Sequence, residues 1–218
     1  MRVLAVDTTS PRGSLAVADA TGILAEERVV SDAGHSHWLL PAADRALRRL
    51  GLEAKALDLF AVTSGPGSFT GLRVGIGSVQ GLALAARRPC LGIPTLDVWA
   101  YEVQAASDAI VVILEAFRGE VFWAVYGGDA RLRGERNVGT LDAVLAVAPA
   151  GSVFVGDLDG ARREAILATV PAATFPQASG FLAATLARLA LVRAQEAGPP
   201  GALQPLYLRG AAIRPSRA

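Results

Sequence analysis

The stretch SGPGSFTGLRVGIGSVQGLALA, residues 64–85, begins as a glycine-rich turn after an apolar strand and continues as a helix. Glycine recurs inside this predicted helix at positions 71, 75, 77 and 81. Each interior glycine costs a helix about 1 kcal/mol relative to alanine. A helix that carries several of them must recover that free energy by packing closely against other parts of the structure.

The helix glycines form two rows, Gly71 with Gly75 and Gly77 with Gly81. Small residues four positions apart leave a shallow groove, into which another helix or a sheet can pack. One row can face the chain's own sheet while the other faces a second chain, or both rows can be internal. The turn can also bind a phosphate, but the lysine of a P-loop is missing, so close strand-to-helix packing is favoured.

The segments on either side of this helix predict an α/β fold. Three apolar segments near the N-terminus are separated by turn residues, which predicts an antiparallel meander. An amphipathic helix follows, and strands flank the glycine-rich helix in a βαβ unit with parallel strands and a right-handed crossover. The predicted elements are strands at 3–7, 14–19, 23–30, 57–63 and 90–95 and the amphipathic helix at 37–50.

From about residue 109 the pattern starts again. AIVVILEAFRGEVFWAVYG, residues 109–127, is predicted as strand, turn and strand, and loosely echoes the first 20 residues. Helices are predicted near 141–147, 160–169 and 180–196. We therefore predict two lobes, residues 1–107 and a smaller lobe of residues 108–218, with a terminal segment at about 203–218 that can pack back on the first lobe.

Net charge, cysteine content and the length of apolar runs exclude several classes of protein. The formal net charge is +1, whereas a protein that binds nucleic acid strongly usually has a clear basic excess. Cys90 is the only cysteine, so no internal disulfide forms. No apolar run reaches the roughly 18 residues of a membrane span, and the N-terminus does not resemble a signal peptide. These features predict a cytoplasmic protein that neither enters a membrane nor binds RNA strongly by itself.

Residues that carry chemistry are few. His35 and His37 are the only histidines, and at this spacing a helix would point them apart, so they cannot share a metal. The sequence around Ser78 is not a nucleophile elbow. Asp7 ends a strand and is followed by hydroxyl residues, an arrangement that suits either a nucleotide phosphate or an Asx turn, and the local sequence favours the turn. We predict no catalytic constellation and no metal site.

Several motifs follow one another along the whole chain: VLAVDTTS (3–10), ILAEE (23–27), HSHWLLP (35–41), GPGSFTGLRVG (65–75), GIPTLDVWA (92–100), RGEVFWAVY (118–126) and PLYLR (205–209). Together they resemble the TsaB family, a subunit of the bacterial machinery that makes N6-threonylcarbamoyladenosine on tRNA. The resemblance implies an actin-like ATPase (ASKHA, ribonuclease H-like) fold of two lobes, the second reduced. It also implies a cytoplasmic, glycoprotease-like protein.

The resemblance implies a partner role rather than an enzyme. The related catalytic subunit TsaD, which modifies adenosine 37 in tRNAs that read ANN codons, carries a metal-binding HxxxH motif after the strand that follows the glycine-rich helix. Here that position reads Thr95, Leu96 and Asp97, without histidine. The implied role is a scaffold or activator of a TsaD homologue, with a TsaE homologue as third member and tRNA bound only through the complex. The isolated chain would need no cofactor, since ATP or ADP and a divalent metal belong to the complex.

The resemblance places the partner surface on the first two predicted helices, and the same surface would form a homodimer when TsaD is absent. The assigned interface residues are Trp38, Leu39, Pro41, Ala42, Arg45, Arg49, Gly71, Val74, Gly75, Ser78 and Val79. A vestigial nucleotide site would comprise Asp7, Thr8, Thr9 and Glu115, where Glu115 stands in place of the aspartate of many relatives.

Two enzyme functions compete with this interpretation. One is a metallopeptidase of the M22 type that acts on TsaD, and it conflicts with two histidines that lack ligand geometry. The other is a small-molecule kinase of the same fold, and the chain is too short for two full lobes that enclose ATP.

Overall fold

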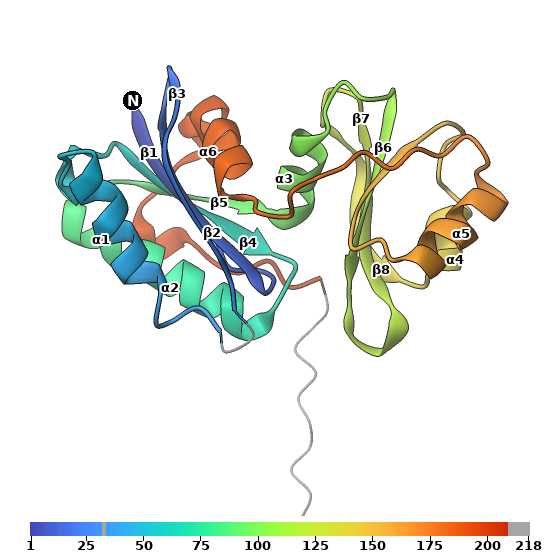
Figure 1. Cartoon of the computed structure of the whole chain (residues 1–218), viewed down its shortest axis with the longest axis horizontal. Coiled ribbons are helices and arrows are strands. Elements are labelled where there is room, and N and C mark those ends of the chain that lie inside the picture. Colours follow the sequence, from blue (N-terminus) through green and yellow to red (C-terminus); the bar gives the residue numbers. More distant parts are fainter. Residues whose placement is uncertain (32–33, 209–218) are drawn as a thin grey trace, which may run out of the picture.

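Two lobes, each built on one mixed β-sheet, make up the part of the chain that the computed structural model describes, residues 1–31 and 34–208 (Figure 1). Five strands form the sheet of the first lobe: β1 (Arg2–Asp7), β2 (Arg12–Asp19), β3 (Gly22–Val30), β4 (Leu59–Gly65) and β5 (Cys90–Pro94). Their order is β3-β2-β1-β4-β5, with the first three antiparallel and β1, β4 and β5 parallel. The predicted meander and βαβ unit are both confirmed.

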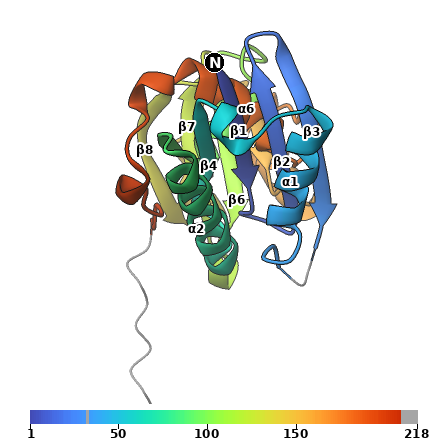
Figure 2. The ribbon, with the colours of Figure 1, turned by 90° about the vertical axis from the view of Figure 1, so that its left-hand side faces the viewer.

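Four helices cover this sheet. Helices α1 (Leu39–Arg49) and α2 (Phe69–Ala86) lie side by side on the face of the sheet that is turned away from the second lobe, as Figure 2 shows. Helices α3 (Thr95–Glu102) and α6 (Ala183–Val192) cover the side that faces the second lobe. Pro41 falls in the first turn of α1, where a missing N–H costs nothing. No helix in the described ranges is long and apolar enough to cross a membrane.

The second lobe is smaller. Its sheet comprises β6 (Ala109–Glu115), β7 (Val121–Gly127), β8 (Leu132–Gly139) and β9 (Val153–Gly156), in the order β8-β7-β6-β9. Helices α4 (Leu141–Leu145) and α5 (Gly160–Thr169) cover the face turned away from the first lobe. Short 3-10 turns occur at Ala54–Ala56, Phe117–Gly119, Ala194–Glu196 and Pro200–Ala202.

The core consists of three apolar clusters. One lies between α1, α2 and the first sheet, and one between the second sheet, α4 and α5. The third and largest joins the lobes, because α3 packs against both sheets and α6 packs beside α3 on the first sheet. Alternating residues of β1 show the division, since Leu4 and Val6 face α1 and α2 while Val3 and Ala5 face α6.

The structure departs from the prediction in two respects, the elements that are present and the place of one helix. β8, β9 and α3 have no counterpart among the predicted elements. Helix α6 falls within residues 108–218 but packs against β1 and β2, so it covers the sheet of the first lobe and not that of the second. The chain after α6 then runs along the first lobe, where Gly198 pairs with Cys90 and the Leu206 N–H donates to Ser64 O (2.7 Å). Residues 209–218 of the predicted terminal segment lie outside the described residues.

Candidate functional site

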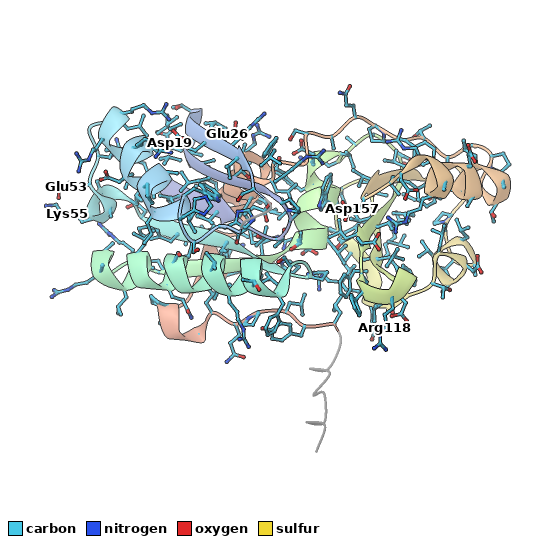
Figure 3. The ribbon with its side chains drawn as sticks, turned by 60° about the horizontal axis from the view of Figure 1, so that its bottom comes forward. Asp19, Glu26, Glu53, Lys55, Arg118 and Asp157 are labelled. Carbon is cyan, nitrogen blue, oxygen red and sulfur yellow. The ribbon has the colours of Figure 1, made fainter. Side chains whose placement is uncertain are left out.

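A cleft between the lobes contains a cavity of about 380 Å³. One wall is formed by the hairpin of residues 8–13, which joins β1 to β2, together with the turn that precedes α2. The other wall includes Glu115, at the end of β6, and Asp157, which Figure 3 places where the lobes meet. Thr9 and Arg12 thus line the same cavity as Glu115, which lies more than 100 residues further along the sequence.

Asp7 lies beneath the hairpin and is fully buried. Its Oδ1 accepts hydrogen bonds from Thr9 N (3.2 Å), Thr9 Oγ1 (2.7 Å) and Thr63 Oγ1 (2.7 Å). The bond from Thr9 N confirms the Asx turn that the local sequence favours. Oδ2 is buried without a partner in the described residues. Burial raises the pKa of Asp7 above its ordinary value of 3.8, although the bonds from Thr9 and Thr63 oppose that change.

The hairpin offers the cleft few backbone donors. The Thr9 N–H is used by Asp7, the Arg12 N–H donates to Ser10 Oγ (3.2 Å), and Pro11 has no N–H. Across the cleft, Glu115 forms an ion pair with Arg162. Of the predicted nucleotide site, Thr9 and Glu115 reach the cavity, while Asp7 and Thr8 lie under its wall. Phosphate binding normally uses several free N–H groups, so this hairpin fits a phosphate poorly.

The inner row of α2 glycines packs on that hairpin. An added Cβ at Gly71 would collide with Thr8 O, and one at Gly75 would collide with Thr8 Oγ1. Thr8 Oγ1 donates to Gly71 O (2.8 Å). The prediction that Gly71, Gly75 and Val79 lie on a partner surface is therefore wrong, because all three are buried, the two glycines against the hairpin and Val79 in the apolar cluster between the helices and the first sheet.

The other glycine row faces outward. An added Cβ at Gly77 or Gly81 meets nothing within 4 Å among the described residues outside the helix's own backbone. Val74 and Ser78 are half-buried beside this row. Leu84, one turn after Gly81, has 71% of its surface exposed. Close packing on the sheet thus explains one glycine row but not the other.

Helix α1, which contacts α2, also carries exposed side chains. Leu40 is 50% exposed, and Pro41 and Arg45 are also exposed. We call the set Leu40, Pro41, Arg45, Arg49, Arg73, Val74, Gly77, Ser78, Gly81 and Leu84 the outer helical face. Trp38, Leu39 and Ala42 do not belong to it, because they are buried against the first sheet, and their assignment to the interface is wrong in this structure.

Arg45 and Arg49 reach back from α1 to the neighbouring strand. Arg49 Nη2 lies 2.5 Å from Glu27 Oε1, and Arg45 Nη2 lies 3.3 Å from Glu27 Oε2. Both guanidinium groups remain more than half exposed. They are therefore oriented by β3 and still accessible to a partner.

Both ring nitrogens of His35 are used internally. Trp38 Nε1 donates to His35 Nδ1 (2.8 Å), so Nε2 carries the proton and donates to Ser10 O (2.8 Å). His35 is therefore not oriented to bind a metal. Across residues 1–31 and 34–208, no three His, Cys, Asp or Glu side chains are grouped so that they can hold a metal ion.

A buried ion cluster joins the lobes and was not predicted. Asp97 of α3 is 3% exposed and accepts hydrogen bonds from Tyr126 Oη (2.8 Å), Arg136 and Arg193. Burial and the charge of Asp97 raise the pKa of Tyr126 far above its ordinary value. The other members of the cluster lie 29 to 96 positions from Asp97 in the sequence. The only local signal for the cluster was therefore an aspartate, Asp97, within an apolar segment.

Comparison with protein families matches residues 22–156 to the family described as "TsaD: tRNA N6-adenosine threonylcarbamoyltransferase". The match covers more than half of the chain. The chain belongs to the TsaD family. This agrees with the resemblance found in the sequence.

Within the TsaD family, the chain is 35% identical over 131 residues to the "tRNA threonylcarbamoyladenosine biosynthesis protein TsaB" of Escherichia coli (strain K12). That alignment covers 59% of this chain and 56% of the E. coli protein. The solved structure of "YeaZ from Pseudomonas aeruginosa" superimposes with a TM-score of 0.77 at 27% identity, over 95% of this chain and 99% of that chain.

A more distant structure bears on the fold only. A ROK hexokinase from Thermus thermophilus superimposes with a TM-score of 0.52 at 15% identity, over 90% of this chain and 98% of that chain. Hexokinases of this kind have the two-lobed actin-like architecture. The predicted actin-like fold of this TsaD-family chain is thereby confirmed.

Proposed function

We propose that the chain is a non-catalytic subunit that binds and activates a TsaD homologue for the synthesis of N6-threonylcarbamoyladenosine on tRNA, with a TsaE homologue as third member. Membership of the TsaD family, the likeness to E. coli TsaB and the motifs along the whole chain support a role in this modification. The outer helical face supports the role of a partner protein.

The observation that carries the proposal is the outward glycine row of α2. Gly77 and Gly81 each cost the helix about 1 kcal/mol relative to alanine. The described residues leave open space where a side chain would lie, so the chain's own packing does not require glycine there. Close approach of a second backbone does require it, since a Cβ would hold the two backbones apart.

The surroundings of the row suit a protein partner. Leu40 and Leu84 are large exposed apolar side chains on neighbouring helices, and exposed apolar surface of this kind marks interaction sites. Arg45, Arg49 and Arg73 are exposed on the same two helices, and protein interfaces likewise combine apolar side chains with a polar rim. We propose that the same face forms a homodimer when the TsaD homologue is absent.

The cofactors of the reaction belong to the complex in this proposal. The hairpin of residues 8–13 has few free amides, and Glu115 is engaged by Arg162. We therefore assign no nucleotide or metal to the isolated chain, and tRNA binds through the assembled complex. A metallopeptidase acting on TsaD finds no support in the surroundings of His35, both of whose ring nitrogens are bonded internally.

Reconstitution tests this function. The purified TsaD and TsaE homologues of the same organism are incubated with tRNA, ATP and the threonylcarbamoyl donor, with and without this chain. We expect modified adenosine only when the chain and the TsaD homologue are both present. Turnover by the chain alone, or full activity without it, would contradict the proposal.

A further inference from the structure

The hairpin of residues 8–13 lines the cleft on one side and contacts α2 and the segment that leads into α1 on the other. Thr9, Ser10 and Arg12 line the cleft cavity. The first half of α2 and the segment that leads into α1 meet the same hairpin, while exposed side chains of these two helices form the outer helical face. A short segment therefore separates the cleft from the proposed partner surface.

Helix α2 holds the first half of the hairpin. Thr8 Oγ1 donates to Gly71 O (2.8 Å), and the N–H of Ser68, the N-cap of α2, donates to Thr9 O (2.8 Å). Gly67 and Gly71 leave no room for a Cβ, because Thr9 and Thr8 occupy that space. The start of α2 and the hairpin are thus in backbone-to-backbone contact.

The segment that leads into α1 holds the second half. His35 Nε2 donates to Ser10 O (2.8 Å), and His35 Nδ1 accepts from Trp38, the residue before α1. A Cβ at Gly13 would lie 2.5 Å from Trp38 Cζ2 and 2.7 Å from His35 Nδ1. His35 is only 4% exposed, so this contact is part of the core.

We propose that this hairpin couples the outer helical face to the cleft, so that a partner bound on the face changes the hairpin and the cleft wall. The reason is that the hairpin is in close contact with α2 and with the segment before α1, and densely packed contacts transmit a shift of a helix to the segment beneath it. Coupling between two sites is reciprocal, so a change in the hairpin must alter partner affinity. The inference rests on the proposed function, because it requires the TsaD homologue to bind the outer helical face.

Hydrogen exchange of the wild-type chain is the primary test. Amide exchange is measured by mass spectrometry with and without a saturating amount of the TsaD homologue. We expect exchange in residues 8–13 to slow by about threefold or more in the complex, although these residues lie behind the helices. The turn of residues 116–120 follows Glu115 in the opposite lobe and should exchange at an unchanged rate.

Thr8→Val provides the second test, because Thr8 is buried and does not belong to the outer helical face. It removes the hydroxyl that joins the hairpin to Gly71 O. We expect affinity for the TsaD homologue to fall about fivefold to tenfold, the effect of one hydrogen bond, and Thr8→Ser to restore it. Thr63→Val is the matched control, because Thr63 is equally buried but bonds to Asp7. It should keep wild-type affinity even if it lowers the melting temperature.

The outcomes separate the two proposals. If the wild-type chain forms no complex with the TsaD homologue, the proposed function fails. If the complex forms but exchange in residues 8–13 is unchanged, the coupling is refuted and the function stands. Equal affinity of Thr8→Val and wild type would also refute the coupling. If Thr8→Val does not fold, the exchange measurement on the wild-type chain still decides.

Discussion

Asp97 of α3 receives a two-point ion pair from Arg136 of β8, with Arg136 Nη2 2.7 Å from Oδ1 and 2.8 Å from Oδ2. The pair connects a helix of the first lobe to the sheet of the second. Arg193, just after α6, donates to the same carboxylate (3.0 Å). One buried carboxylate thus holds together three segments that are far apart in the sequence.

Asp97→Asn should destabilise the protein strongly. The change leaves Arg136 and Arg193, each about a quarter exposed, without a negative charge. Removing one member of a buried ion pair costs about 3 kcal/mol or more in the free energy of unfolding. Urea denaturation measures this cost. Glu53→Gln is the control, because the ion pair of Glu53 with Lys55 lies on the surface (Figure 3) and should contribute nothing measurable.

Gly71→Ala should lower the melting temperature although alanine is the better helix former. The new methyl group would collide with Thr8 O, a backbone atom that cannot turn aside. Overpacking of this kind costs typically 1–3 kcal/mol. Differential scanning calorimetry checks the prediction against Gly77→Ala, which meets open space and should raise the melting temperature. A stabilised Gly71→Ala variant would show that the two glycine rows are assigned the wrong way round.

The buried Asp7 should make stability depend on pH. Its pKa is raised in the folded state, so its contribution is fully present below 3.8 and is lost as pH rises through the higher folded value. Asp7→Asn removes this titration. We therefore expect the free energy of unfolding of the variant, minus that of the wild type, to increase with pH from about 4 upward. Urea denaturation from pH 4 to 8 measures the difference, and a constant difference would contradict the prediction.

The isolated chain should form a homodimer through the outer helical face. The exposed Leu40 and Leu84 and the outward glycine row of α2 give each copy an apolar surface to bury. Light scattering at tens of micromolar should give twice the mass of the chain. A monomer at that concentration would count against this part of the account.

The sequence predicted the five strands of the first lobe and helices α1 and α2 because their patterns are local. The strands around Asp7 and the stripe of α1 follow from alternation and from the helical period. The helical period also groups the glycines of α2 into two rows, but it does not by itself indicate which row faces the sheet. Leu72, Ile76, Val79 and Ala83, all buried, lie on the side of Gly71 and Gly75 and were the signal that was missed.

Other features depend on contacts between distant segments. Helix α6 returns from the second half of the chain to cover β1 and β2, and no local pattern indicates that return. The cluster around Asp97 likewise forms only when α3, β8 and the end of α6 meet. The cleft is predictable only in part, since Asp7, Thr9 and Glu115 were named from motifs but their distances depend on how the lobes pack.

The most direct test of the account is the affinity of Gly81→Leu for the TsaD homologue, measured by calorimetric titration beside the wild-type chain. Leucine at this position meets open space and favours the helix, so the melting temperature should not fall. Ala168→Leu, on an exposed position of α5 in the other lobe, is the matched control. We predict that the wild type and the control bind the TsaD homologue and that Gly81→Leu binds at least about tenfold more weakly. Wild-type affinity in a folded Gly81→Leu, or no binding by the wild type, would contradict the account.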